Sequence, residues 1–259
     1  MVRPKKHLGQ HFLRDENIAR RIVDSLTGKT SVVAEVGPGT GILSKYLLAD
    51  PSIRPYFFEI DRESVEYLKN VYPAMGEHLV ECDFLEQDLS FIPEPFTVIG
   101  NFPYNISTQI LFKVLDYRNH VPEVVGMFQK EVAERIASPP GSKKYGILSV
   151  LLKAWYDIEY LFTVNESVFY PAPKVKSAVI RIKRNSVNEL NCSEELFFKT
   201  VKTAFNQRRK TLRNALKGMA SEVAPSAKIT ALFDKRAERL AVEDFVTLTR
   251  FFEGLPETC

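Results

Sequence analysis

Residues 31–41 read SVVAEVGPGTG, a short apolar run that leads into a glycine-rich turn. The run at 32–36 predicts a buried strand, and residues 42–49 after the turn predict a helix. Because glycine tolerates a positive φ and has no Cβ, Gly37 and Gly39 would let the backbone turn tightly and approach a ligand. The glycine spacing departs from the G-x-G-x-x-G pattern of dinucleotide sites. The loop therefore favours a nucleoside without a pyrophosphate, and S-adenosylmethionine (SAM) is the leading candidate.

Strand-like and helix-like segments alternate through the rest of the first 130 residues. Further strands are expected in RPYFFEID (54–61), HLVECDF (78–84), FTVIG (96–100) and EVVGMFQ (123–129). Two later apolar runs, 158–164 and 176–184, have no long helix between them and can pair antiparallel at the sheet edge. This order predicts an α/β fold, a Rossmann-like domain with a mixed seven-stranded sheet.

A change in composition marks the end of this domain. The stretch RNSVNELNCSEE at 184–195 is polar, and the segments beyond it carry apolar residues at the i, i+3, i+4 spacing of helices. We therefore expect a catalytic domain at 1–187 and a small, all-helical domain at 188–259.

The overall composition limits the class of protein. Hydrophobic residues make up 45% of the chain and charged residues 26%, as in an average soluble domain. The three cysteines lie far apart without zinc or disulfide spacing, and the four histidines form no ligand cluster. The basic amino terminus lacks the apolar region of a signal peptide, and no run is long enough to span a membrane. We expect a cytoplasmic monomer without a membrane span or a metal.

Carboxylates follow the second and third predicted strands. In an open parallel sheet the ligand lies beyond the carboxyl ends of the strands. Glu59 ends the second strand, where a carboxylate can accept both hydroxyl protons of a ribose. Asp83 ends the third strand and can accept from the exocyclic amine of an adenine. Both positions fit a bound adenosine.

Several segments together resemble a known enzyme family. EVGPGTG, FFEID, CDFL and GNFPYNIS, in this order and spacing, resemble the SAM-dependent adenine-N6 methyltransferases. KKHLGQHFL, FYPAPKVKSAV and AFNQRRKTLRNAL narrow the resemblance to the KsgA/RsmA rRNA adenine N6,N6-dimethyltransferases, along essentially the whole chain. The resemblance implies transfer of methyl groups from SAM to two adjacent adenines in the 3'-terminal hairpin loop of 16S rRNA. S-adenosylhomocysteine would be the product, and the immature 30S particle the partner, with a role in small-subunit biogenesis.

The chemistry of that reaction explains the residues 101–104, NFPY. The exocyclic nitrogen of adenine is a poor nucleophile because its lone pair is delocalised into the ring. Two acceptors, the Asn101 side-chain oxygen and the Phe102 carbonyl, would draw this nitrogen toward tetrahedral geometry in the transition state. Pro103 has no N–H and favours an extended Phe102, which leaves that carbonyl free. Tyr104 offers a ring on which the extruded adenine can stack.

The resemblance also implies roles for residues outside the NFPY segment. Phe169 would close the other side of the adenine sandwich, and Lys174 would reach an RNA phosphate. SAM contacts carry over to the following residues: His11, Leu13, Gly37, Glu59, Asp83 and Asn101. Many relatives have Asn where this chain has His11, so a backbone contact is the one expected to persist there. The basic stretch with Arg208, Arg209 and Lys210 would bind RNA phosphates from the helical domain.

Three other functions stay open at this point. An Erm-type enzyme would methylate 23S rRNA with the same catalytic domain, although the AFNQRRKTLRNAL segment argues against it. A ribosome assembly factor would bind the immature subunit without needing catalysis. A DNA adenine methyltransferase uses a tetrapeptide similar to NFPY.

Overall fold

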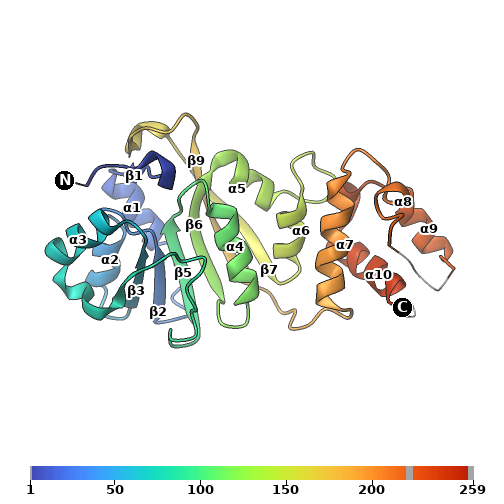
Figure 1. The fold of residues 1–259 in the computed structure, drawn as a ribbon, viewed down its shortest axis with the longest axis horizontal. Helices are drawn as coiled ribbons and strands as arrows, with labels where there is room; N and C mark the ends of the chain where they lie inside the picture. The colour runs from blue at the N-terminus through green and yellow to red at the C-terminus, as the bar shows by residue number, and fades with distance from the viewer. Residues whose placement is uncertain (1, 220–223, 256–259) are drawn as a thin grey trace. The chain divides into compact units, whose positions relative to one another are not determined.

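The computed structural model describes residues 2–219 and 224–255 and divides the chain into two compact units (Figure 1). The first unit comprises Met1–Ala133 and Ile158–Arg184, and the second Glu134–Asp157 and Asn185–Cys259. The second unit thus combines the carboxyl-terminal region with an insertion before the last strands. The domain boundary expected at residue 187 stays a prediction.

A seven-stranded mixed sheet forms the centre of the first unit. Its order is β4-β3-β2-β5-β6-β9-β7. The strands are β2 (Val32–Val36), β3 (Arg54–Glu59), β4 (Leu79–Glu81), β5 (Phe96–Asn101), β6 (Glu123–Gln129), β7 (Tyr156–Val164) and β9 (Ser177–Arg184). The strands from β4 across to β6 run parallel, and β9 pairs with β6 antiparallel. The sheet predicted from the sequence is confirmed, and its parallel strands direct their carboxyl ends to one edge.

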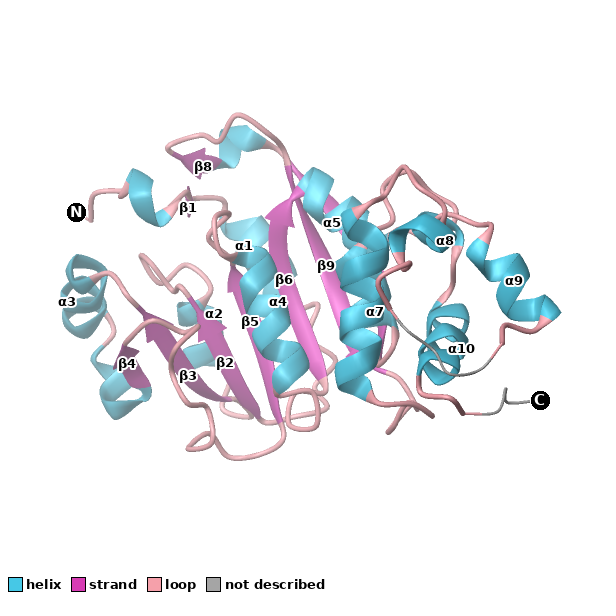
Figure 2. Ribbon diagram, turned by 45° about the vertical axis from the view of Figure 1, so that its right-hand side comes forward, coloured by secondary structure: helices cyan, strands magenta, loops and turns pink. Residues whose placement is uncertain are grey.

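Amphipathic helices cover the sheet (Figure 2). They are α1 (Glu16–Val23), α2 (Ser44–Ala49), α3 (Arg62–Val71) and α4 (Ser107–Asp116). Aspartates cap two of them, because Asp15 accepts from the first backbone N–H groups of α1, and Asp61 accepts from the Glu63 N–H of α3. The helix α4 buries Ile110, Leu111, Val114 and Leu115 on its inner side. It begins at Ser107, separated from the NFPY segment by two residues, and therefore anchors its carboxyl-terminal end.

A two-stranded sheet joins distant parts of the first unit. Its strands β1 (Phe12–Leu13) and β8 (Phe169–Tyr170) pair antiparallel. The 3-10 helix η1 (Lys6–Leu8) precedes β1, and η3 (Glu166–Val168) precedes β8. This pairing, visible in Figure 2, brings the amino-terminal segment beside the loop PAPK at 171–174, which follows β8.

The second unit is helical. Its helices are α6 (Ile147–Lys153), α7 (Glu194–Asn206), α8 (Leu212–Ala215), α9 (Ala227–Phe233) and α10 (Val242–Phe252), and α5 (Lys130–Ala137) enters it from the first unit. Aromatic pairs fill its core: Phe205 stacks with Phe245, and Trp155 meets Phe197 edge-on. The helical character predicted for the carboxyl-terminal region is confirmed. Over the described parts of the chain, no helix combines the length and apolar character that crossing a membrane requires.

Candidate active site

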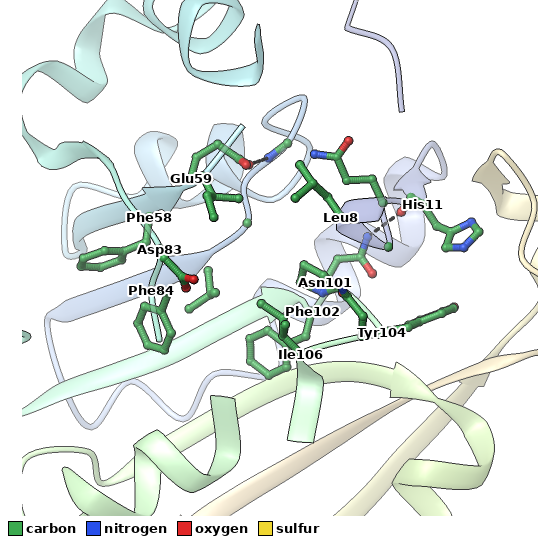
Figure 3. A pocket seen from close by; sticks show the side chains of 18 of the residues that line it. Leu8, His11, Phe58, Glu59, Asp83, Phe84, Asn101, Phe102, Tyr104 and Ile106 are labelled. Atoms are coloured by element: carbon green, nitrogen blue, oxygen red, sulfur yellow. Dashed lines mark hydrogen bonds between the residues drawn. The ribbon is translucent and has the colours of Figure 1, made fainter. Parts of the chain in front are cut away.

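A cavity of about 260 Å³ lies beyond the carboxyl ends of β2, β3, β4 and β5 (Figure 3). Its walls come from five segments, at 8–12, 36–39, 58–60, 82–84 and 101–106. Four of these follow the parallel strands, and the fifth is the amino-terminal segment. This donor cavity therefore gathers the motifs that the sequence placed at strand ends.

The glycine loop between β2 and α2 has the backbone that the sequence predicted. Gly37 has a φ of 70° and Gly39 a φ of 59°, which favour glycine. A Cβ on Gly39 would lie 3.0 Å from a ring carbon of Phe12. The Gly39 N–H donates to Oε2 of Glu59 at 2.9 Å. The loop is therefore fastened to the end of β3.

Glu59 is buried at the end of β3 and faces the donor cavity. One carboxylate oxygen accepts from Gly39 N–H and the other from Asp61 N–H, both at 2.9 Å. Burial raises its pKa, while these backbone hydrogen bonds act in the opposite direction. Each carboxylate oxygen offers two lone pairs. Glu59 therefore keeps acceptor capacity for the hydroxyls of a ribose.

Glu35 is a second buried carboxyl, which the sequence analysis missed. It lies in β2 and is 1% exposed, and its Oε2 accepts from the Ser44 hydroxyl at 2.7 Å. Burial raises its pKa to about 8, and the nearby Glu59 adds to the rise. Its signal in the sequence was an acidic residue inside the apolar run VVAEV. At neutral pH it is mostly protonated, which limits the negative charge behind the glycine loop.

Asp83 and Phe84 form the opposite end of the donor cavity. The strand β4 ends at Glu81, whereas the sequence predicted an end at Asp83. Cys82 N–H still donates to the Glu59 carbonyl oxygen at 3.0 Å, but the backbone turns after it. The Asp83 carboxylate accepts from Leu85 N–H at 2.8 Å. The buried Phe84 ring packs edge-on against Phe58, with centroids 5.4 Å apart. An apolar wall beside a carboxylate suits an adenine ring with its amine.

Asn101 ends β5 with its side-chain amide in a fixed orientation. Its Nδ2 donates to the main-chain oxygen of His11 at 2.9 Å, as the dashed line in Figure 3 shows. A carbonyl can only accept, so the amide nitrogen faces His11 and the amide oxygen points away from it. His11 thus acts on the site through its main chain. Its ring nitrogen Nδ1 donates to the Pro171 carbonyl at 2.7 Å.

The Phe102 ring is locked against the sheet. It is 1% exposed and packs edge-on against Phe128, with centroids 5.2 Å apart. Beneath it lie Gly100 and Gly126, which pair across β5 and β6. A Cβ on Gly126 would lie 2.3 Å from the Phe102 ring, and one on Gly100 would lie 2.8 Å away. The two glycines make room for the ring. The packed ring in turn fixes the position of the Phe102 carbonyl, just beyond the end of β5.

Tyr104 and His11 stand between two cavities. Their ring centroids lie 5.2 Å apart, and the Tyr104 hydroxyl is 2.5 Å from the Ser177 hydroxyl. Both residues line the donor cavity and also a second cavity of about 450 Å³, which we call the acceptor cavity. Its other walls include the loop at 171–175, Gln129 and Lys6. Pro103 lines the donor cavity beside them.

The amino-terminal wall is held by the buried carboxylate of Asp61. The Lys5 ammonium forms an ion pair with it, and Gln10 Nε2 donates to its other oxygen at 3.3 Å. Lys5 N–H in turn donates to the Gln10 side-chain oxygen at 2.8 Å. This group ties residues 5–10 to the start of α3, so the segment stays over the donor cavity.

The remaining predicted residues of the first unit differ in their relation to the two cavities. Leu13 and Phe169 pair across the two-stranded sheet and are buried in the hydrophobic core, at 2% and 5% exposure, and neither lines the donor or the acceptor cavity. Lys174 is exposed and lines the acceptor cavity. The roles assigned to Leu13 and Phe169 stay predictions.

The three basic residues predicted to bind RNA lie in the second unit and differ in their surroundings. Arg209 and Lys210 are exposed. Arg208 instead donates to Glu238 at 3.0 Å and to the Tyr145 carbonyl at 3.1 Å. Arg208 therefore ties the loop before α6 to the segment before α10. Within the described residues, no group of three or more His, Cys, Asp or Glu is placed to hold a metal ion.

Comparison with known proteins places these features in a family. A family model described as ribosomal RNA adenine dimethylase matches residues 1–253. The chain belongs to this family. It is 58% identical over 256 residues to ribosomal RNA small subunit methyltransferase A of Cytophaga hutchinsonii, with 98% of each chain covered. The predicted resemblance is confirmed.

Solved structures extend the family assignment to the fold. A dimethyladenosine transferase from Plasmodium falciparum superposes with a TM-score of 0.77 at 23% identity, covering 95% of this chain and 99% of that one. The 23S rRNA methyltransferase ErmE gives a TM-score of 0.64 at 24% identity, covering 94% of this chain and 99% of that one. The Rossmann-like methyltransferase fold predicted from the sequence is confirmed.

Proposed function

We propose that this chain transfers methyl groups from SAM to N6 of two adjacent adenines in the 3'-terminal hairpin loop of small-subunit rRNA. The observation that carries the proposal is the Asn101 amide, turned by the His11 carbonyl so that its oxygen is left for an amine. Asn101 lines the donor cavity, in a member of the ribosomal RNA adenine dimethylase family.

The donor cavity fits an adenosine-containing methyl donor. Glu59 would hold the ribose hydroxyls, Asp83 the adenine amine, and the Phe84 ring would pack against the base. Gly37 lines the cavity, and its positive φ lets the backbone approach the ligand there without a Cβ. When bound, SAM supplies a methyl group already activated by its attachment to a cationic sulfonium. The residues of this chain therefore have to act on the acceptor amine.

The chain's part in the reaction is to orient and polarise that amine. The Asn101 oxygen and the Phe102 carbonyl would accept hydrogen bonds from its two N–H groups, which localises the nitrogen lone pair toward the methyl group. The Asn101 amide is neutral and takes no proton before transfer, so the extra proton leaves the amine for solvent afterwards. The locked Phe102 ring holds the second acceptor, its own carbonyl, in place. Alignment of the amine with the methyl group and the sulfur would supply the remaining rate enhancement through proximity.

The acceptor cavity would receive the target adenine. It meets the donor cavity at Tyr104 and His11, where the Tyr104 ring offers a stacking surface. Its volume of about 450 Å³ leaves room for an amine that already carries one methyl group. Phe169 would have to leave the core to reach the base, so its predicted stacking role requires a rearrangement on RNA binding.

Basic side chains would position the RNA. Lys174 lies at the acceptor cavity, and Arg209 and Lys210 are exposed in the second unit. Phosphate contacts of this kind fix register and weaken with added salt. We propose that Arg208 contributes mainly by ordering its own unit through Glu238 and Tyr145. The immature 30S particle as partner, action as a monomer and a cytoplasmic location belong to the same proposal.

The test is methyl transfer from tritiated SAM to unmethylated small and large subunits, followed by nucleoside analysis. We expect N6,N6-dimethyladenosine in small-subunit RNA, at two adjacent positions located by primer extension. Label confined to large-subunit RNA would instead establish an Erm-type activity. The fold shared with ErmE makes that the second candidate, whereas the relative at 58% identity is named for the small subunit.

The substitution Asn101→Ala separates catalysis from binding. It removes the side-chain acceptor, so we expect methyl transfer to fall at least a hundredfold while small-subunit binding stays within about threefold. Transfer near the wild-type rate would refute the acceptor role. Loss of subunit binding along with activity would show that Asn101 acts in folding or docking instead.

A further inference from the structure

The segment that carries Asp83 and Phe84 has little regular structure of its own. Residues 82–95, between β4 and β5, form turns and bends without helix or strand. Beyond Cys82, whose N–H donates to the Glu59 carbonyl, the backbone hydrogen bonds around Asp83 are local, from Glu86 N–H and Gln87 N–H to its carbonyl. A loop held by local turns alone would place the Asp83 carboxylate poorly. Contacts from outside the segment must therefore contribute to its position.

Two side chains of α4 and its carboxyl-terminal cap supply such contacts. Lys113 Nζ donates to the Leu85 carbonyl at 2.9 Å and to the Gln87 carbonyl at 2.5 Å. One turn further along, the Tyr117 hydroxyl donates to Asp88 at 3.0 Å and accepts from Leu89 N–H at 3.2 Å. Residues four apart project from the same side of a helix. Together they clamp the loop at successive points.

The charge of Lys113 also matches its surroundings. Its ammonium lies 5.7 Å from the centroid of the Phe84 ring, and it attracts the carboxylates of Asp83 and Asp88. Partial burial lowers the pKa of Lys113, and these carboxylates oppose that effect. A cation that binds two carbonyls at once beside an aromatic ring is a specific arrangement rather than a freely solvated lysine.

We infer that Lys113 is a positioning residue for cofactor binding: by holding the Leu85 and Gln87 carbonyls it fixes Asp83 and Phe84 against the adenine of the methyl donor. The inference deepens the proposed function and rests on its assignment of the donor cavity to SAM. The same helix begins at Ser107, separated from the NFPY segment by two residues. Lys113 therefore links the adenine end of the donor cavity to the helix that anchors the acceptor groups.

The experiment compares Lys113→Met with Lys69→Met, which removes an exposed lysine of α3 and is matched in charge. Calorimetry measures the binding of S-adenosylhomocysteine and of its analogue in which hydrogen replaces the adenine amine. We expect Lys113→Met to weaken S-adenosylhomocysteine binding about tenfold, because it removes a charged hydrogen-bond donor. Binding of the analogue should weaken by less than about threefold, because Asp83 has no amine to accept from.

Two further measurements keep a structural effect apart from a positioning effect. The turnover number at saturating SAM should stay within twofold of wild type, while the Michaelis constant for SAM rises with the dissociation constant. Tyr117→Phe, which removes one hydroxyl of the clamp, should weaken S-adenosylhomocysteine binding in the same direction by about two- to threefold. It serves as the second variant if Lys113→Met folds poorly.

Each contrary outcome is distinct. Affinity of Lys113→Met equal to that of Lys69→Met overturns the inference, and so does an equal loss of affinity for the analogue. A fall in turnover at unchanged affinity overturns it as well. If wild-type protein fails to bind S-adenosylhomocysteine, the assignment of the donor cavity fails, and the proposed function falls with it.

Discussion

Substituting Gly126 by alanine tests whether the buried Phe102 ring sets the position of the catalytic carbonyl. The new Cβ would lie 2.3 Å from the Phe102 ring and 2.7 Å from the Phe128 ring. Carbon atoms that touch normally lie about 3.5–4.0 Å apart, so the Phe102 ring has to shift by about 1 Å. A shift of that size at a reacting group costs about a hundredfold in rate.

The same clash has a measurable cost in stability. Overpacking of a core costs about 1–3 kcal/mol in the free energy of unfolding. In a chain of this size each kcal/mol lowers the melting temperature by about 2–4 °C. We therefore expect Gly126→Ala to melt several degrees lower than wild type. Binding of S-adenosylhomocysteine should stay within threefold, because the Phe102 ring is 1% exposed and packs mainly against Phe128 and the two glycines, although Phe102 also borders the donor cavity.

Single-turnover methyl transfer with small subunits measures the rate, and thermal unfolding measures the stability. Gly218→Ala is the control, because a Cβ there would meet no described atom within 4 Å. Combining Gly126→Ala with Phe102→Leu should give a non-additive stability, by about 0.5–3 kcal/mol, because the two residues touch each other. If Gly126→Ala loses stability but transfers methyl groups within threefold of the wild-type rate, the ring does not set the carbonyl's position.

Two other predictions concern the buried Glu35 and the exposed cations of the second unit. The folded-state pKa of Glu35, about 8, lies above its ordinary value of 4.5, so the folded protein holds a proton there that the unfolded chain releases. The free energy of unfolding of wild type relative to Glu35→Gln should therefore fall as pH rises from 4.5 to about 8 and level off above that. Denaturant unfolding at several pH values measures it. A difference in unfolding free energy that does not change with pH would contradict the assigned burial effect. The double substitution Arg209→Ala and Lys210→Ala should weaken small-subunit binding. The slope of log affinity against log salt concentration should become shallower by about 1 for each phosphate that is no longer neutralised. Binding of S-adenosylhomocysteine should stay unchanged. An unchanged salt dependence would show that these cations lie away from the RNA.

The sequence predicted the sheet well because its signals are local. Each parallel strand is a short apolar run next to a turn, so EVVGMFQ could be placed at 123–129, as the structure has it. The strand before Asp83 was extended too far, since apolar character continues past Glu81 although the hydrogen-bond ladder does not. The helix at 130–137 was missed, as it follows β6 without any turn residue between them.

Long-range contacts in the site escaped the sequence pattern. Nothing near Asn101 indicates that the His11 carbonyl would orient it, because that hydrogen bond joins residues far apart in the chain. In the sequence, the glycines at 100 and 126 indicate only weaker strands. The structure shows that the Phe102 ring packs over both of them. Arg208 looked like its exposed neighbours, and only the fold shows its bonds to Glu238 and Tyr145.

The tie between residues 5–10 and Asp61 has a practical consequence for anyone who handles this protein. The segment it holds supplies the main-chain oxygen that turns the Asn101 amide, so the acceptor geometry depends on residues near the start of the chain. A purification tag fused before Val2, or trimming of the first dozen residues by a protease, would act on the chemistry directly. Preparations for kinetic work are better tagged at the opposite end.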